Sequence, residues 1–227
     1  MLSQNWPDPP DKRALTMRAA DLISLAVREG DTTAMDVVMK RVGGPGGVTA
    51  FLEGKGVLGL RVDRYQREIE AEMFAMPTFR AAWRTQAAFD AARDAVQPTA
   101  RQAAMDHFIL DPRDTATVPA ALGFLDLLAG AQLVSPAATR LLMGWMGTAP
   151  DGLFKPGLPA GSFVAHASGS SASDLGFTPA TAELALATFP NGRRYALAGF
   201  LVGSTATAEG RAALFAAGAA LASRAMG

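Results

Sequence analysis

A change of hydrophobic pattern near Leu158 limits the fold classes that this sequence can adopt. Before it, apolar residues recur at three- and four-residue spacing, as they do along one face of a helix. After it, apolar runs between turn residues predict strands over 162–167, 183–189 and 195–203. Pro190-Asn191-Gly192 separates the last two runs and predicts a hairpin, because Asn-Gly tolerates the positive φ angles of a tight turn.

The third predicted strand, YALAGFLV, is almost entirely apolar, so we expect both of its faces to be covered. An Ala-rich helix is expected after it, over 208–225. Helices first, then an antiparallel hairpin with a helix across it, predict an α+β fold.

Capping and breaking residues divide the first part of the chain into helices. Gly43-Gly44-Pro45 is expected to end one helix, Gln97-Pro98 to separate two helices, and Ser135 to cap a helix that has Pro136 at its first position. The predicted helices span 17–29, 33–41, 48–53, 77–96, 99–110, 118–128 and 136–147. The aromatic residues expected to pack between the fourth and fifth of these helices are Phe79, Trp83, Phe89 and Phe108.

We therefore divide the chain into three parts. They are an extended leader (1–15), an all-helical lobe (16–157) and a C-terminal part (158–227) of antiparallel strands plus a helix, which completes one unit with the lobe. Within the lobe, an Ala-rich stretch without glycine, at about 71–110, differs from its surroundings.

Composition excludes several classes of protein and site. The 21 Lys and Arg residues balance 21 Asp and Glu residues, so there is no electrostatic reason to expect a nucleic-acid partner. The sequence has no cysteine and two isolated histidines, so we expect no metal site and no cofactor. No apolar run approaches the roughly 20 residues that span a bilayer, and residues 1–15 lack the apolar region of a signal peptide.

Five segments, in order, resemble class A β-lactamases and related serine hydrolases of the penicillin-binding superfamily. They are LISLAVREGDTTAMDVVMKRVGGPGGVTAFL, RVDRYQREIE, DPRDTATVPAALGFLDLL, FVAHASG and the closing strand with its helix. The resemblance implies the β-lactamase/transpeptidase fold, with a helical insertion in the Ω loop at about 71–110. It also implies descent from hydrolases that attack β-lactams, esters or peptides with a serine.

Three motifs that carry chemistry in this family are altered, as the resemblance places them. Gly30-Asp31-Thr32 takes the place of S-D-N, and Gly30 has no hydroxyl to pass a proton to the leaving nitrogen. Gln66 matches the Ω-loop glutamate, and an amide cannot act as a base at pH 7. Ala167 replaces the lysine of K-[ST]-G, which supplies positive potential for the substrate carboxylate.

Other matching positions are kept. Thr32, Ser168, Gly169 and Ser170 retain hydroxyls and close backbone approach, so they are the candidate substrate-binding residues. Asp31 matches the architectural aspartate of S-D-N, and Arg64 and Asp114 match the pair that ties the two ends of the Ω loop together. The resemblance therefore predicts that the scaffold is kept where the chemistry is lost.

The family's nucleophile lies in an S-x-x-K motif before S-D-N. Only 29 residues precede Gly30, and none of them forms this motif. By the resemblance, the segment with the nucleophile, its helix and the first two strands is missing from this sequence. If Met1 is the true start we expect a cytoplasmic protein; a signal peptide upstream of it would make the protein periplasmic or secreted.

Four further side chains need an interpretation. Glu70 follows Gln66 by one helical turn, so it is either a relocated base or a solvated or Arg-paired carboxylate. Glu68 is expected to pair with Arg67 or Arg64. His166 should point away from the cleft if Ala167 points into it, because side chains alternate along a strand. His107 has no carboxylates around it and is expected to lie at the surface or in packing.

Three functional hypotheses remain open. The chain is a catalytically silent homologue, or an active serine hydrolase whose S-x-x-K lies upstream of Met1, or an interaction module that uses the Ω-loop insertion. A β-lactam-like, ester or peptide ligand fits the first two hypotheses. The third predicts a homo-oligomer or an unstable protein, because without the first strands the strand over 195–203 would be an exposed apolar sheet edge, and such edges recruit other chains.

Overall fold

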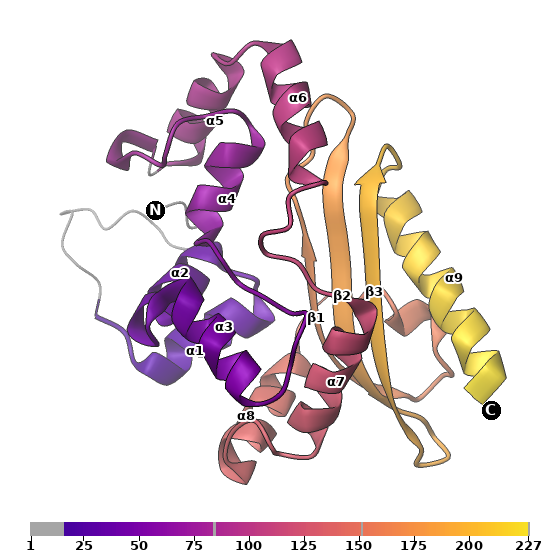
Figure 1. Cartoon of the computed structure of the whole chain (residues 1–227). Helices are drawn as coiled ribbons and strands as arrows, with labels where there is room; N and C mark the ends of the chain where they lie inside the picture. Colours follow the sequence, from indigo (N-terminus) through magenta and orange to yellow (C-terminus); the bar gives the residue numbers. More distant parts are fainter. Residues whose placement is uncertain (1–15, 84, 151, 227) are drawn as a thin grey trace.

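A computed structural model of the protein describes residues 16–83, 85–150 and 152–226. The predicted leader, 1–15, lies outside the described residues. Helices make up the first two thirds of the chain, and a three-stranded antiparallel sheet with a final helix makes up the rest (Figure 1). The α+β class predicted from the sequence is therefore confirmed.

The helical part contains eight α-helices within the described residues. They are α1 (Ala19–Arg28), α2 (Thr32–Arg41), α3 (Gly44–Gly54), α4 (Gln66–Met73), α5 (Gln86–Asp94), α6 (Pro98–Phe108), α7 (Val118–Ala129) and α8 (Pro136–Met146). Two short 3₁₀ helices, η1 (Ala81–Trp83) and η2 (Lys155–Gly157), lie in the connections. Ser135 caps α8 as predicted, since its hydroxyl accepts a hydrogen bond from the Ala138 N–H.

The sheet has the order β1-β2-β3, and both pairs of strands are antiparallel. The strands are β1 (Phe163–Ser170), β2 (Thr178–Thr188) and β3 (Arg194–Ser204), and α9 (Ala208–Met226) follows. The predicted hairpin joins β2 to β3, with Gly192 at a φ of 81°. Every strand is longer than its sequence pattern indicated.

Helices cover both faces of the sheet (Figure 1). On one face, Phe215 and Ala219 of α9 pack against Val164, Ala185 and Leu197. On the other face, Leu128 of α7 and Met146 of α8 pack against Ala165 of β1. The strand β1 therefore holds the C-terminal half of the fold against the helical lobe.

The prediction that both faces of the last strand are covered is wrong for its second half. Phe200 is 38% exposed and Val202 is 56% exposed, and among the described residues β3 is an edge strand that pairs only with β2. Leu197, on the face toward α9, is buried. An apolar run indicates that a strand favours burial, but it does not show whether another helix or strand covers that strand.

The helix predicted over 77–96 is also wrong, because the structure has η1 and α5 there instead. Thr85 starts α5, and its hydroxyl accepts a hydrogen bond from the Ala88 N–H. A threonine cap of this kind begins a new helix, so the high helix propensity of the flanking alanines does not extend across it. Pro45 was expected only to end the preceding helix, but it lies in the first turn of α3. The helix α3 therefore starts four residues earlier than predicted.

The inserted segment has a small core of its own. Phe74, Met76, Phe89 and Met105 are buried together, and Trp83 and Phe108 pack at its edge. Phe79, also predicted to lie in this seam, contacts the Trp83 ring edge-on. An ion pair also anchors the insertion to the connection between β1 and β2. The buried Arg101 of α6 donates to Asp174 there, with 2.6 Å between Nε and Oδ2.

Candidate functional site

The turn between α1 and α2 carries the altered S-D-N triplet. Gly30 has a φ of 63°, which reverses the chain after α1. The buried Asp31 side chain then caps α2, accepting a hydrogen bond of 2.8 Å from the Ala34 N–H. Thr32 is the first residue of α2. The Asp31 carboxylate therefore fixes the start of α2.

A cavity of about 480 Å³ lies between this turn, α7, α8 and β1. Gly30, Ala167 and Ser168 line it, so the structure brings two of the three altered motifs to one place. Most of the remaining wall is apolar, with Val27, Met35, Phe124, Leu128, Leu142 and Met146. Pockets of this size hold small molecules, and we refer to this one as the cleft.

Gln66 and Glu70 are not among the described residues that line the cleft. They lie on α4, and a hydrogen bond joins the first turn of this helix to α2. The Gln66 N–H donates to Oδ1 of the buried Asp36, with 2.8 Å between nitrogen and oxygen. Burial raises the pKa of Asp36 above its ordinary value. Burial, and secondarily the nearby Asp36, also raises the pKa of Glu70. Glu70 is thus a desolvated carboxylate, a condition that suits a base and also occurs in structural carboxylates.

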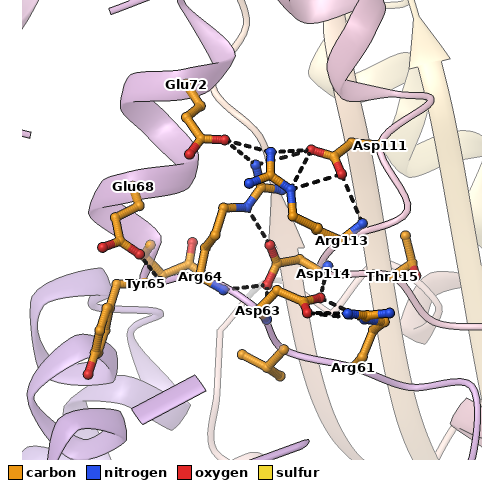
Figure 2. A network of polar contacts seen from close by, with 12 residues as sticks. Arg61, Asp63, Arg64, Tyr65, Glu68, Glu72, Asp111, Arg113, Asp114 and Thr115 are labelled. Atoms are coloured by element: carbon orange, nitrogen blue, oxygen red, sulfur yellow. Dashed lines mark hydrogen bonds and ion pairs between the residues drawn. The ribbon is translucent and has the colours of Figure 1, made fainter. Parts of the chain in front are cut away.

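The two ends of the insertion meet in a network of charged groups. Arg64 donates from Nε to Oδ2 of Asp114 at 2.6 Å and from Nη1 to Oε2 of Glu72 at 2.6 Å (Figure 2). The other Asp114 oxygen accepts the Asp63 and Arg64 N–H groups, and Asp63 in turn accepts the Asp114 N–H. Asp63 and Arg64 are therefore joined to Asp114, which lies 51 and 50 residues later in the sequence, through both side-chain and backbone groups.

Asp111 and Arg113 add a second layer to this network, opposite Glu72 on α4 (Figure 2). The hydrogen bond from Arg113 lowers the pKa of Asp111 to about 2, and Arg64 contributes to this shift. We name the network of Arg61, Asp63, Arg64, Glu72, Asp111, Arg113 and Asp114 the neck of the insertion. Arg64 and Asp114 are in contact there, as the resemblance predicted.

Glu68 does not make the predicted ion pair with Arg67 or Arg64. Its Oε2 instead accepts the Tyr65 N–H at 2.9 Å, at the start of α4 (Figure 2). A glutamate three residues into a helix commonly returns to the preceding backbone N–H in this way.

His166 lines the cleft together with Ala167 and Ser168, so the prediction that it points away from the cleft is wrong, and its ring lies beside Glu183 of β2. The His166 Nδ1 atom lies 3.6 Å from Glu183 Oε1, and His166 Nε2 lies 3.2 Å from the Ala149 carbonyl oxygen. The other Glu183 oxygen accepts the Leu153 and Phe154 N–H groups. Burial raises the pKa of this fully buried carboxyl to about 7. The structure therefore offers no Ser-His pairing between Ser168 and His166.

The Ser170 hydroxyl lies 2.9 Å from that of Thr181 on the neighbouring strand. Ser168, Gly169 and Ser170 are exposed, at the end of β1. The Ser168 side chain is therefore accessible from the cleft, whereas the Ser170 hydroxyl is engaged by Thr181 of β2.

Sequence reasoning did not identify Asp36, Glu72, Asp111, Arg113 or Glu183. Only Glu183 left a signal, as the single charged side chain in TPATAELALAT. Within the part of the chain that the structure describes, no group of three or more His, Asp or Glu side chains could hold a metal ion. Nor does any helix of this part combine the length and apolar character needed to cross a membrane.

A family model described as "Beta-lactamase enzyme family" matches residues 3–225. Among solved structures, the chain is similar to a β-lactamase from Chitinophaga pinensis, at 19% identity with a TM-score of 0.71. It is also similar to the class A β-lactamase of the last common ancestor of Gram-negative bacteria (GNCA4), at 26% identity with a TM-score of 0.69. Each match covers 93% of this chain and 66% of that protein, so the chain spans just under two thirds of their length.

The extended-spectrum β-lactamase TLA-3 is similar too, at 19% identity with a TM-score of 0.71, and the match covers 96% of this chain and 67% of TLA-3. The two matches at 19% identity establish the fold alone. The fold predicted from the sequence agrees with all three structures.

Proposed function

The chain belongs to the β-lactamase enzyme family, and from this premise we propose that its cleft is a β-lactamase-like site that is catalytically silent in these 227 residues. One observation carries the proposal: Gly30 and Ala167 stand in the cleft, and Gln66 on α4, where the family has a proton donor, a cation and a base. In addition, no S-x-x-K tetrapeptide occurs anywhere in the sequence.

Each replacement removes one chemical step. In the family, the serine of S-x-x-K attacks the substrate carbonyl and forms the acyl-enzyme, and without S-x-x-K this step has no nucleophile. Without a carboxylate at Gln66 there is no base at that position to activate the deacylating water. Without a cation at Ala167, a substrate carboxylate gains no charge-assisted hydrogen bond from β1. The exposed hydroxyl of Ser168 still supports weak binding of a β-lactam-like, ester or peptide ligand.

We predict that the 227-residue protein forms no covalent adduct with a fluorescent penicillin and does not hydrolyse a chromogenic cephalosporin above the buffer rate. Intact mass spectrometry after incubation checks the adduct, and absorbance checks turnover. A class A β-lactamase run in parallel establishes that both assays detect acylation and hydrolysis. An adduct on this chain would contradict the proposal, and peptide mapping would then identify the nucleophile.

A second candidate is an active serine hydrolase, in a longer form of the protein that carries S-x-x-K. The observation in its favour is Glu70, a desolvated carboxylate one turn from Gln66, which suits a relocated base. In that longer form, Glu70→Gln should slow deacylation, whereas the matched change Glu68→Gln removes a carboxylate that only caps α4. Equal activity in the two variants would exclude Glu70 as the base.

A third candidate is an interaction module, which uses the Ω-loop insertion or the open edge of β3. The edge is the better supported surface, because Phe200 and Val202 are exposed on β3 and Phe200 also lines a groove of about 340 Å³ between β3 and α9. Unpaired strand edges with apolar side chains attract other strands.

This candidate predicts concentration-dependent self-association that Val202→Lys abolishes, because a charge on the edge blocks strand addition. Light scattering after size exclusion checks the mass over a wide range of concentrations. The matched control is Val42→Lys, at an exposed valine remote from the sheet. A monomer at all concentrations, or equal effects of the two lysines, would contradict this role of the edge.

A further inference from the structure

A second cavity, of about 650 Å³, lies at the far end of the sheet from Ser170. Its wall comes from the end of α7, from α8 and from the strand ends near the β2–β3 hairpin. None of its lining residues lines the cleft. We name it the sheet-end cavity, and its volume is in the range typical of small-molecule sites.

The floor of the sheet-end cavity is apolar. Met143 of α8, Phe163 of β1 and Leu186 of β2 contribute side chains to it. A flat or branched hydrocarbon group would remove these surfaces from water, which favours binding in proportion to the apolar area covered.

Cationic groups dominate the charged part of the wall. Arg140 of α8 and Arg194 of β3 line the cavity, and neither forms an ion pair with another described residue. Asp126 is the single acidic residue among the lining residues, and it also forms no ion pair within the described chain. The wall therefore carries one excess positive charge in a chain whose formal net charge is zero.

A buried hydroxyl adds a second, independent indication. Thr139 lines the cavity and is 6% exposed, and its hydroxyl oxygen has no hydrogen-bond partner among the described residues. Buried polar atoms without a partner are uncommon in folded proteins, because each costs the desolvation of that group. The hydroxyl oxygen itself has almost no accessible surface, so a ligand oxygen in the cavity would give it an acceptor only after the Thr139 side chain rotates.

We propose that the sheet-end cavity binds a small organic carboxylate with an apolar body. The guanidinium groups of Arg140 and Arg194 bind the carboxylate, since planar guanidinium groups match the two oxygens of a carboxylate. The apolar body rests on Met143, Phe163 and Leu186, and Thr139 donates to a ligand oxygen. The site is distinct from the cleft and does not depend on hydrolase activity.

The proposal is tested with phenylacetate as the probe and phenylacetamide, its neutral isostere, as the control ligand. Ligand-observed NMR and thermal shifts of the 227-residue protein give the affinity. We expect phenylacetate to bind with a dissociation constant of about 1 mM or below and the amide to bind about tenfold more weakly. The double variant Arg140→Gln/Arg194→Gln should lose about tenfold in affinity for phenylacetate, whereas Arg193→Gln, outside the lining, should retain it.

Thr139→Val separates a ligand role from a structural one. Valine has the same shape and removes the unpartnered hydroxyl, so the unliganded protein should be at least as stable as before while phenylacetate binds several-fold more weakly. The proposal is overturned if phenylacetate does not bind at about 10 mM. Equal binding of phenylacetate and the amide, or equal losses in the double variant and Arg193→Gln, would overturn it as well.

Discussion

Replacing Arg64 with alanine is expected to lower the free energy of unfolding by about 3 to 5 kcal/mol, the cost of removing one partner from a buried ion pair. The Arg64 side chain is 6% exposed, and it pairs with Asp114 and Asp111, which are 14% and 7% exposed. Without Arg64, these carboxylates would remain largely out of water and lose a cation. Asp111 would keep its contact with Arg113, whereas Asp114 would be left as a largely buried carboxylate without its cation.

Urea denaturation followed by circular dichroism measures this effect. The matched control is Arg61→Ala, because Arg61 is 52% exposed and, within the described part of the chain, pairs only with Asp63 at the rim of the neck. An exposed pair of this kind contributes about 0 to 1 kcal/mol. If the two variants unfolded at the same urea concentration, the neck would contribute no more to stability than a surface ion pair.

The second large effect concerns the buried carboxyl of Glu183 and depends on pH. Because its pKa in the folded protein is about 7, against an ordinary value of 4.5, the folded state holds a proton more tightly than the unfolded state. Glu183 therefore stabilises the fold fully below pH 4.5, and this contribution is lost as the pH rises through 7. A shift of this size corresponds to about 3 kcal/mol.

The variant Glu183→Gln keeps the shape and cannot ionise. We expect it to match the unmodified protein near pH 5 and to exceed its free energy of unfolding by about 2 to 3 kcal/mol at pH 8. The amide oxygen can still accept the Leu153 and Phe154 N–H groups, and the amide N–H can donate toward His166 Nδ1. Glu53→Gln, at an exposed glutamate, is the control and should leave the pH dependence unchanged.

Denaturation curves at several pH values for all three proteins give the answer. Parallel pH profiles for the unmodified protein and Glu183→Gln would show that the carboxyl is ionised in the folded state. A further variant, Glu183→Leu, leaves the two N–H groups without an acceptor. It should be less stable at every pH, by roughly 1 to 3 kcal/mol for each group.

The sequence predicted the parts of the fold that depend on local signals. The Asn-Gly turn, the Ser135 cap and the apolar strands are local patterns, and each appears in the structure, although β2 begins five residues before its predicted start. The resemblance placed Arg64 beside Asp114 across 50 residues, which no local pattern could do. The broken helix at Thr85 was missed because the alanines on both sides favour helix equally well in either arrangement.

The sequence predicted only those residues of the candidate site that match the family's motifs in their order along the chain. Asp36, Glu72, Asp111 and Arg113 have common side chains in polar stretches, and their roles arise from contacts between segments far apart in sequence. Glu183 differs, because a glutamate within an apolar strand conflicts with burial. That conflict marks a residue as worth inspection, but it does not tell which groups surround it.

The neck also determines how the inserted segment can change over evolutionary time. It closes a chain loop from Asp63 to Asp114 at its base, much as a covalent cross-link would. The entropy of closing a flexible loop grows only with the logarithm of its length, by about 0.6 kcal/mol for each doubling. In the connections between the helices of the insertion, outside its buried core, residues can therefore be gained or lost at little thermodynamic cost, and the insertion can diverge in length while its base stays the same.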